Sequence, residues 1–316
     1  MKFSLESINS IFKPAYEVVD QSVESYNESN PYIKLATIAK VCIGRYDCDM
    51  TEEEAKIFLK QVIIARSHEA ALEHYWITVS IPGYFDLQVL SDIQFIQTSQ
   101  CSGFITNIIG NIRMFRDLLR YGISHISVID DAQRRMFADL AYVLTEQYSI
   151  LFEDLQGLNS LQTRNGSYEC KEYPRYWTFA IITNRGVLAE ITRHRVFSFL
   201  VESTRYCNYS KHGILICNPA PYVMTKLWKK TINTICKTYM KMIKSGCKAQ
   251  EARGILPNDL AVHMYMTGTL SQWQHFLALR TASDAHPHIK VIADMIDQKL
   301  PAISDNSNTR STVGWC

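Results

Sequence analysis

The chain has 316 residues, of which 47% are hydrophobic and 20% charged, and its formal net charge is +2. This length and composition suit a compact globule of one large domain or two smaller ones. The balance of 33 basic against 31 acidic residues argues against general binding to nucleic acid or anionic membranes, which requires a basic face.

Targeting signals and cysteine usage point to the cytoplasm. The first residues contain no apolar core long enough for a signal peptide, and no run approaches the ~18–20 apolar residues of a membrane span. The nine cysteines are scattered, odd in number and without a CxxC pair. We therefore expect free thiols in a cytoplasmic protein, and neither a disulfide framework nor a zinc site.

Helix and strand signals alternate in the N-terminal half. Thr51 and Glu54 are spaced as a capping box at the start of a helix. The segment HYWITVSI at 74–81 is rich in strand-forming residues, and its nearest match in composition is YWTFAIIT at 176–183. These two segments are expected to be strands of the sheet.

The long segment between these two strands has helical character. Apolar residues from Ile105 to Leu119 recur at helical spacing, and Gly122 follows as a stop signal. A second helix is expected over 131–155, and 157–174 is expected to be a polar loop. The segment at about 85–173 is therefore predicted to contain a helical pair that packs on the sheet or on an oligomer face.

The C-terminal half is expected to be mostly helical. Residues 185–199 are expected to form a helix that passes into a loop at 202–213. Further helices are expected at about 221–245, 257–266, 270–281 and 286–299. The whole pattern predicts an α+β fold, mostly helical, with a small antiparallel or mixed sheet and a helical insertion.

Common cofactor and metal motifs are absent from the sequence. There is no GxGxxG after a strand and no GxxxxGK[ST], so neither a dinucleotide fold nor a phosphate loop is signalled. His68 and His74 are six positions apart, roughly 240° around a helix, and cannot face one metal ion. His286 and His288 lie close in the sequence but have no evident third ligand. We expect no metal site.

The segment TRHRVFSFLVESTRYCNYSK at 192–211 does not fit an ordinary structural element. It concentrates cationic and hydroxyl side chains: Arg193, His194, Arg195, Ser203, Thr204 and Arg205. A solvated basic helix end is the simpler interpretation, because arginines near a helix C-terminus complement its dipole. However, three consecutive side chains point in different directions, so they cannot all belong to one solvated face. The set suits an anion with several oxygens.

Two further arginines stand in similarly apolar settings. Arg253 precedes GILP, and Arg280 ends WQHFLALR. Either one alone is equally well explained by an ion pair with a carboxylate. Together with Arg193 and Arg205, they indicate a polyanionic ligand such as a nucleotide.

These motifs resemble a known family. Arg-His-Arg followed after seven residues by Ser resembles the signature of the flavin-dependent thymidylate synthases. Four other segments resemble that family's elements in the same order: SHEAALEH, ESTRYCNYSK, RGILP and HFLALRTASDAHP. The resemblance covers about 35–82 and 176–300. It implies one domain over 1–316, with an insertion at about 85–173 that compact members lack.

The resemblance implies an activity and its ligands. The family makes thymidylate (dTMP) from deoxyuridine monophosphate (dUMP), with FAD as cofactor and methylene-tetrahydrofolate and NADPH as co-substrates. It acts as a homotetramer with shared active sites. By carry-over, the flavin contacts would be His68, Arg193, His194, Arg195, Val196, Thr269, Ser271 and His275. The nucleotide contacts would be Glu190, Arg193, Glu202, Ser203, Thr204, Arg205, Arg253 and Arg280.

The resemblance also implies the catalytic chemistry. Arg280 would face the uracil ring, where a permanent positive charge favours the ionised imide and stabilises electron density at ring carbon 5. The base itself would then be the nucleophile. Cys207 and Cys217 have no paired base in the sequence and are interpreted as structural.

The sequence departs from the family at two positions. Ala70 replaces a common Ser or Thr, and Val201 replaces a common Gln or Glu, so that the carboxylate moves to Glu202. Two alternatives therefore stay open. One is a non-catalytic nucleotide- or flavin-binding protein on the same fold, which flavin absorbance would test. The other is an RNA-binding module, which predicts salt-sensitive binding to polynucleotide and which the overall charge disfavours.

Overall fold

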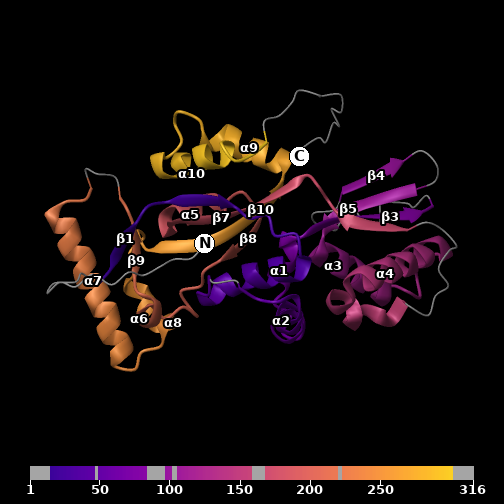
Figure 1. Ribbon diagram of the computed structural model, residues 1–316, viewed down its shortest axis with the longest axis horizontal. Coiled ribbons are helices and arrows are strands. Elements are labelled where there is room, and N and C mark those ends of the chain that lie inside the picture. Colours follow the sequence, from indigo (N-terminus) through magenta and orange to yellow (C-terminus); the bar gives the residue numbers. More distant parts are fainter. Residues whose placement is uncertain are drawn as a thin grey trace.

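The computed structural model describes residues 15–46, 49–83, 97–101, 105–158, 168–219 and 223–301. It confirms an α+β fold with many helices. Two four-stranded sheets are antiparallel throughout, and a two-stranded sheet is parallel. Figure 1 shows the larger sheets side by side along the long axis, with the helices around them. Within these ranges, no helix is both long and apolar enough to cross a membrane.

The central sheet has the strand order β2–β7–β10–β8. These strands are Ser22–Ser25, Tyr176–Asn184, Ala261–Thr269 and Ser198–Val201. The helices α5, α9 and α10 share a buried core with this sheet (Figure 1). They are Arg185–Ile191, Leu270–Arg280 and Pro287–Asp297. Trp273 and Phe276 of α9 lie against Phe179 and Phe197 and are fully buried, which fixes α9 over the sheet.

The second sheet has the strand order β4–β5–β3–β6. Its strands are Gln97–Cys101, Ile105–Asn111, Trp76–Pro82 and Glu169–Glu172. Three helices follow β5 along the chain: α3 (Ile112–Ser124), α4 (Asp131–Phe152) and the 3-10 helix η5 (Glu153–Leu158). We call the described residues between Trp76 and Glu172, which include most of the segment predicted as an insertion at about 85–173, the inserted module. Its two ends lie close together, because Tyr173 N–H donates to the Trp76 carbonyl at 2.9 Å.

The inserted module shares one core with the N-terminal helices. These are α1 (Pro31–Lys40), the 3-10 helix η1 (Val41–Ile43), α2 (Glu52–Phe58), the π-helix η2 (Leu59–Ile64) and the 3-10 helix η3 (Glu69–His74). Fully buried Leu35 and Ile38 of α1 belong to the same cluster as Phe115 of α3 and Phe137 of α4. The module is therefore an integral part of the hydrophobic core.

A third, smaller core lies at the other end of the molecule (Figure 1). The strand β9 (Leu215–Cys217), which pairs in parallel with β1 (Glu17–Val19), contributes Ile216 to this core. The long helix α7 (Lys226–Lys244) follows along the chain and also contributes to it. Three short elements complete it: α6 (Tyr209–His212), α8 (Ala249–Ala252) and the 3-10 helix η6 (Arg253–Ile255).

Several predicted elements are confirmed. The capping box of Thr51 and Glu54 is present at the start of α2. The strands predicted at 74–81 and 176–183 are β3 and β7, although they lie in different sheets. The helices predicted at about 221–245, 270–281 and 286–299 are α7, α9 and α10. The helical pair predicted in the insertion is α3 and α4, and it packs on the second sheet.

Three predicted helices are wrong in part or entirely. Residues 105–111 are strand β5, and the helix starts only at Ile112, after the Asn111 side chain accepts from the Met114 N–H. The helix predicted at 185–199 ends at Ile191. The segment predicted as a helix at 257–266 contributes to β10, because β7 and β8 pair with it on both sides.

Six of the nine cysteines have a described side chain, and each of these six is free. The other three, Cys48, Cys101 and Cys316, have no described side chain.

Candidate functional site

The Arg-His-Arg segment is a tight turn between α5 and β8. Asn184 caps α5 by accepting from the Val187 N–H at 2.8 Å, and the helix ends at Ile191. His194 N–H then donates to the Ile191 carbonyl, and Phe197 N–H donates to the His194 carbonyl, at 3.0 and 3.1 Å. The turn therefore follows directly from the end of a short capped helix.

Phe197 anchors this turn in the core. Its ring centroid lies 4.5 Å from that of Trp273. Gly268 of β10 allows this approach, because a Cβ atom there would lie 2.4 Å from the Phe197 ring. With Phe197 inside, His194 is buried, whereas Arg193 and Arg195 are exposed. The turn thus presents two cations to solvent around one buried imidazole.

Arg280 meets His194 directly. The Arg280 Nε–H donates to His194 Nε2 at 2.9 Å, although the two residues are 86 positions apart. Burial, followed by the charges of Arg280 and His275, lowers the pKa of His194 to about 4. The imidazole is therefore neutral near pH 7, with Nε2 as an acceptor and the proton on Nδ1. This contact joins the segment that is predicted to contact the flavin with the arginine that is predicted to face the uracil.

The N-terminus of α9 reaches the same turn. Thr269 and Gln272 form a capping box, and Gln272 also donates to the Val196 carbonyl at 2.9 Å. The hydroxyls of Thr269 and Ser271 lie 3.2 Å apart at this helix start. A helix N-terminus with hydroxyl donors favours an anion. Gln272 is a contact that the sequence interpretation missed, although the pattern Thr-x-x-Gln signals it.

The Ser203–Arg205 loop starts from a buried carboxylate. Glu202 is 2% exposed and accepts from the phenols of Tyr46 and Tyr209 at 2.6 and 2.5 Å. It also shares a hydrogen bond with His263 Nδ1 at 2.8 Å. Burial alone would raise the pKa of Glu202, but these three hydrogen bonds outweigh burial and lower it. Within the described residues, the Glu202 carboxylate is thus hydrogen-bonded to side chains of the protein itself.

Arg253 lies beside this loop. Its Nη1 donates to the Thr204 hydroxyl at 3.4 Å, which brings together two predicted nucleotide contacts that are 49 residues apart. Arg205 is exposed and stacks over the Tyr206 ring at 5.3 Å. Neither guanidinium pairs with a carboxylate in the part of the chain that the structure describes.

Two predicted site residues lie apart from this cluster. Glu190 is partly buried, and its carboxylate lies 3.5 Å from His286 Nδ1. His68 is exposed at the start of η3. No contact among the described residues joins the His68 side chain to the Arg-His-Arg turn.

The environment of Cys207 and Cys217 bears on nucleophilic chemistry. Burial raises the pKa of both thiols to about 12, with Glu202 adding to the effect at Cys207 and Asp259 at Cys217. Both thiols stay protonated at neutral pH and are poor nucleophiles. Among the described residues, no group of three or more His, Cys, Asp or Glu side chains is placed to hold a metal ion.

The neutral state of His194 predicts a pH dependence of stability. An unfolded chain holds a histidine with a pKa of about 6.5. Between pH 6.5 and 4, the unfolded state binds this proton and the folded state does not, so stability rises with pH across that window. We expect acidification from pH 6.5 to 4 to lower the free energy of unfolding by about 2 kcal/mol through His194. Urea unfolding at a series of pH values measures this change.

His194→Gln is the matched variant for this measurement. Glutamine keeps an acceptor for Arg280 but does not titrate, so the slope between pH 6.5 and 4 should become shallower. A slope remains, because burial and the charge of Lys34 lower the pKa of His74 to about 3. An identical slope in wild type and variant would contradict the role assigned to His194.

Comparisons with known proteins bear on this site. Residues 157–303 match the family model described as thymidylate synthase complementing protein. The flavin-dependent thymidylate synthase of Thermococcus onnurineus is 28% identical over 145 residues, which cover 44% of this chain and 58% of that protein. The enzyme of the same name from Pyrococcus abyssi is 26% identical and covers 40% of this chain and 53% of that protein. The chain thus spans somewhat more than half the length of these relatives.

Solved structures give weaker similarity. Thymidylate synthase X from Helicobacter pylori, with FAD and dUMP, has a TM-score of 0.35 and 15% identity, and the match covers 60% of this chain and 89% of that one. A UMP/dUMP methylase, PolB from Streptomyces cacaoi, bound with 5-Br dUMP, has a TM-score of 0.38 and 14% identity, with 90% and 91% covered. At these values, neither overlay supports a comparison of individual residues.

Proposed function

We propose that this chain, whose residues 157–303 match the model of the thymidylate synthase complementing protein family, is a flavin-dependent thymidylate synthase that makes thymidylate by reductive methylation of dUMP. Methylene-tetrahydrofolate is the carbon donor, and FAD reduced by NADPH is the source of reducing equivalents. The observation that carries the proposal is the hydrogen bond from Arg280 to neutral His194. It brings two motifs of the family into one site.

The residues around this hydrogen bond suit FAD. A dinucleotide carries a pyrophosphate, which needs cations and free donors. Arg193 and Arg195 are exposed and have no carboxylate partner among the described residues. In our proposal three parts of the chain hold the cofactor. They are the turn with Val196, which includes His194, the start of α9 with Thr269, Ser271 and His275, and the separate residue His68. Bound FAD supplies the hydride chemistry of the reaction.

The loop after Glu202 suits the nucleotide. Arg253 and Arg205 provide guanidinium groups for phosphate, and Ser203 and Thr204 provide hydroxyl donors, as recognition of a monophosphate requires. In our proposal, Arg193 and Glu190 also contact dUMP. The burial of Glu202 supports a positioning role, in which it holds the loop from behind.

Arg280 supports the chemical step. Its Nε–H donates to His194, so the terminal N–H groups of the planar guanidinium stay available for the substrate. A permanent cation at the uracil favours the ionised imide and stabilises charge on ring carbon 5 as that carbon attacks. The high pKa of Cys207 and Cys217 supports the same mechanism, since neither thiol is a ready nucleophile.

The folate product tests this function. A synthase that takes the hydride from folate releases dihydrofolate, whereas this mechanism releases tetrahydrofolate and consumes one NADPH per thymidylate. Purified protein is incubated with dUMP, methylene-tetrahydrofolate and NADPH, and the folates are separated by chromatography. The released flavin is identified after denaturation. Dihydrofolate as product, or thymidylate formed without flavin and NADPH, would overturn the proposal.

Two arginine variants test the nucleotide site. Arg253→Ala and Arg205→Ala should each raise the dUMP dissociation constant by about tenfold or more, because a charge-assisted contact worth about 1.5–3 kcal/mol is lost. Titration calorimetry measures the constants. Arg135→Ala, which removes an exposed arginine of α4, serves as the control and should leave dUMP affinity unchanged. Unchanged constants in both site variants would refute the assignment.

The resemblance also supports a proposed assembly. We expect one domain over 1–316, with the segment at about 85–173 as an addition, and a homotetramer with shared sites. The molar mass of the flavin-loaded protein in solution tests this assembly.

A further inference from the structure

The turn that carries His68 has a constrained backbone. Ser67 has a φ of 54° and is the one residue other than glycine with positive φ in the described ranges. The N–H groups of Ser67 and His68 donate to the carbonyls of Ile64 and Ile63, at 3.0 and 2.9 Å. An L-residue in the left-handed region persists only where its surroundings hold it. The contacts of the following residue therefore matter for the turn.

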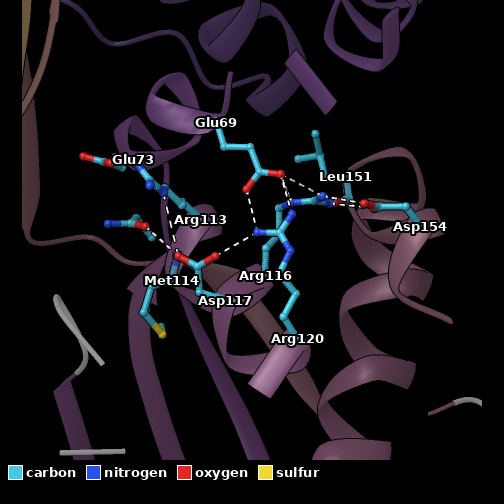
Figure 2. Close-up of polar contacts among 10 residues, drawn as sticks. Glu69, Glu73, Arg113, Met114, Arg116, Asp117, Arg120, Leu151 and Asp154 are labelled. Atoms are coloured by element: carbon cyan, nitrogen blue, oxygen red, sulfur yellow. Dashed lines mark hydrogen bonds and ion pairs between the residues drawn. The ribbon is translucent and has the colours of Figure 1, made fainter. Parts of the chain in front are cut away.

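Glu69 follows His68 and is clamped by two arginines. Its carboxylate accepts from Arg116 Nε and Nη2 at 3.2 and 3.0 Å, and from Arg120 Nη1 and Nη2 at 2.8 and 2.5 Å (Figure 2). Two guanidinium forks on one carboxylate fix both its position and its orientation. Burial alone would raise the pKa of Glu69, but the hydrogen bonds from Arg120 and Arg116 outweigh it and lower the pKa.

The arginines are themselves held firmly. Arg116 is 0% exposed, and it also donates to both Asp154 carboxylate oxygens at 2.8 and 2.7 Å and to the Leu151 carbonyl. Arg120 also donates to Asp117 at 2.8 Å. Figure 2 shows both guanidinium groups directed at the Glu69 carboxylate, with Asp154 on the far side of Arg116. The two arginines that bind Glu69, and the residues that hold these arginines, all belong to the inserted module.

The other end of η3 is fastened to the central sheet. His74 Nδ1 and the Thr267 hydroxyl share a hydrogen bond of 2.7 Å, and both side chains are buried. Thr267 lies two residues before Thr269, the start of α9. The short helix η3 thus bridges the inserted module and the strand that leads to the proposed flavin site, and His68 lies at its module end.

We propose that Glu69 is a positioning residue for FAD, through which the inserted module holds His68 in the conformation that contacts the flavin. This inference rests on the proposed function, in which His68 is a flavin contact. The family model matches residues 157–303, so Glu69, Arg116 and Arg120 all lie outside the segment that it matches. The module thereby sets flavin affinity without touching the flavin.

Glu69→Gln tests the inference. Glutamine keeps the size of the side chain but loses the charge, and its amide N–H groups face the arginine donors. We expect the FAD dissociation constant to rise about tenfold or more, since one charge-assisted clamp is lost. The constant is measured by flavin fluorescence, and the absorption spectrum of the bound flavin is recorded beside it.

Glu73→Gln is the matched control. Glu73 lies one turn further along η3 and accepts from Arg113 of α3 at 2.5 Å, so its ion pair joins the same two elements. Thermal unfolding of both flavin-free variants shows how much each ion pair stabilises the fold. Glu73→Gln should keep the FAD affinity and flavin spectrum of the wild type. Arg120→Lys, which keeps a charge, should bind FAD more tightly than Arg120→Ala.

The outcomes separate this inference from the proposed function. Wild-type protein that binds no FAD overturns the proposed function and this inference with it. Wild-type protein that binds FAD, with Glu69→Gln binding equally well, overturns this inference alone. An equal loss of affinity in Glu69→Gln and Glu73→Gln also overturns it, because a general weakening of the η3–α3 contact then explains both.

Discussion

Glu202→Leu is expected to lower the free energy of unfolding by about 3–5 kcal/mol, which is at the upper end for a single substitution. The reason is that three buried or half-buried donors converge on this carboxylate. Removing it takes away an acceptor that the Tyr46 and Tyr209 phenols and His263 Nδ1 share. A buried donor that has lost its partner bears the full desolvation cost. Urea unfolding followed by circular dichroism measures the change.

Two companion variants sharpen this measurement. Glu202→Gln keeps one acceptor oxygen and should lose less, about 1–3 kcal/mol, so that a folded protein remains to be studied. Glu24→Gln removes a carboxylate whose ion pair with Lys299, at 3.3 Å, is solvent-exposed, and it should change stability by less than about 1 kcal/mol. Equal losses at Glu202 and Glu24 would contradict the role of the buried network.

Arg280→Lys is expected to lower turnover by about 100- to 1,000-fold while changing dUMP affinity much less. Lysine keeps the charge but loses the planar fork, so it cannot reproduce the Nε contact to His194 together with the proposed contact of the terminal N–H groups to the uracil ring. An interaction that strengthens as charge develops on the base lowers the barrier more than it aids binding. Single-turnover kinetics and dUMP titration measure the two effects separately.

The control for this prediction is Arg135→Lys, the same substitution at an exposed position of α4. It should leave both turnover and affinity unchanged. A loss of affinity as large as the loss of turnover in Arg280→Lys would show that Arg280 only holds the substrate.

Local patterns predicted the elements that local interactions decide. The capping box of α2 and the strand composition of β7 are both set by neighbouring residues, and both predictions are confirmed. The segment starting at Ile105 shows the limit of such patterns. Its isoleucines fit a helix, but pairing with β3 and β4 makes 105–111 a strand. Strand formation depends on distant partners, which periodicity does not reveal.

The candidate site also has residues that the sequence indicates and contacts that it does not. The Arg-His-Arg segment and Arg280 stand out because cations and a histidine lie in apolar sequence. The sequence offered no sign that Tyr46 lies against Glu202, because these residues are 156 positions apart. Likewise, the sequence does not show that Glu69 binds two arginines, because only the fold brings Arg116 and Arg120 of α3 to it. Contacts between distant charges require the tertiary structure.

The placement of the cores along the chain affects how the protein is made. Except for Leu200, every buried residue of the core shared by the inserted module and α1 lies between Tyr32 and Leu155. The central core is complete only with Ile296. Ribosomes add roughly 5–20 residues per second, N-terminus first. The first core can therefore close during translation while the second is still being synthesised. Glu69, Arg116 and Arg120 all precede the Arg-His-Arg turn in the chain, so the carboxylate clamp can form before this turn is synthesised.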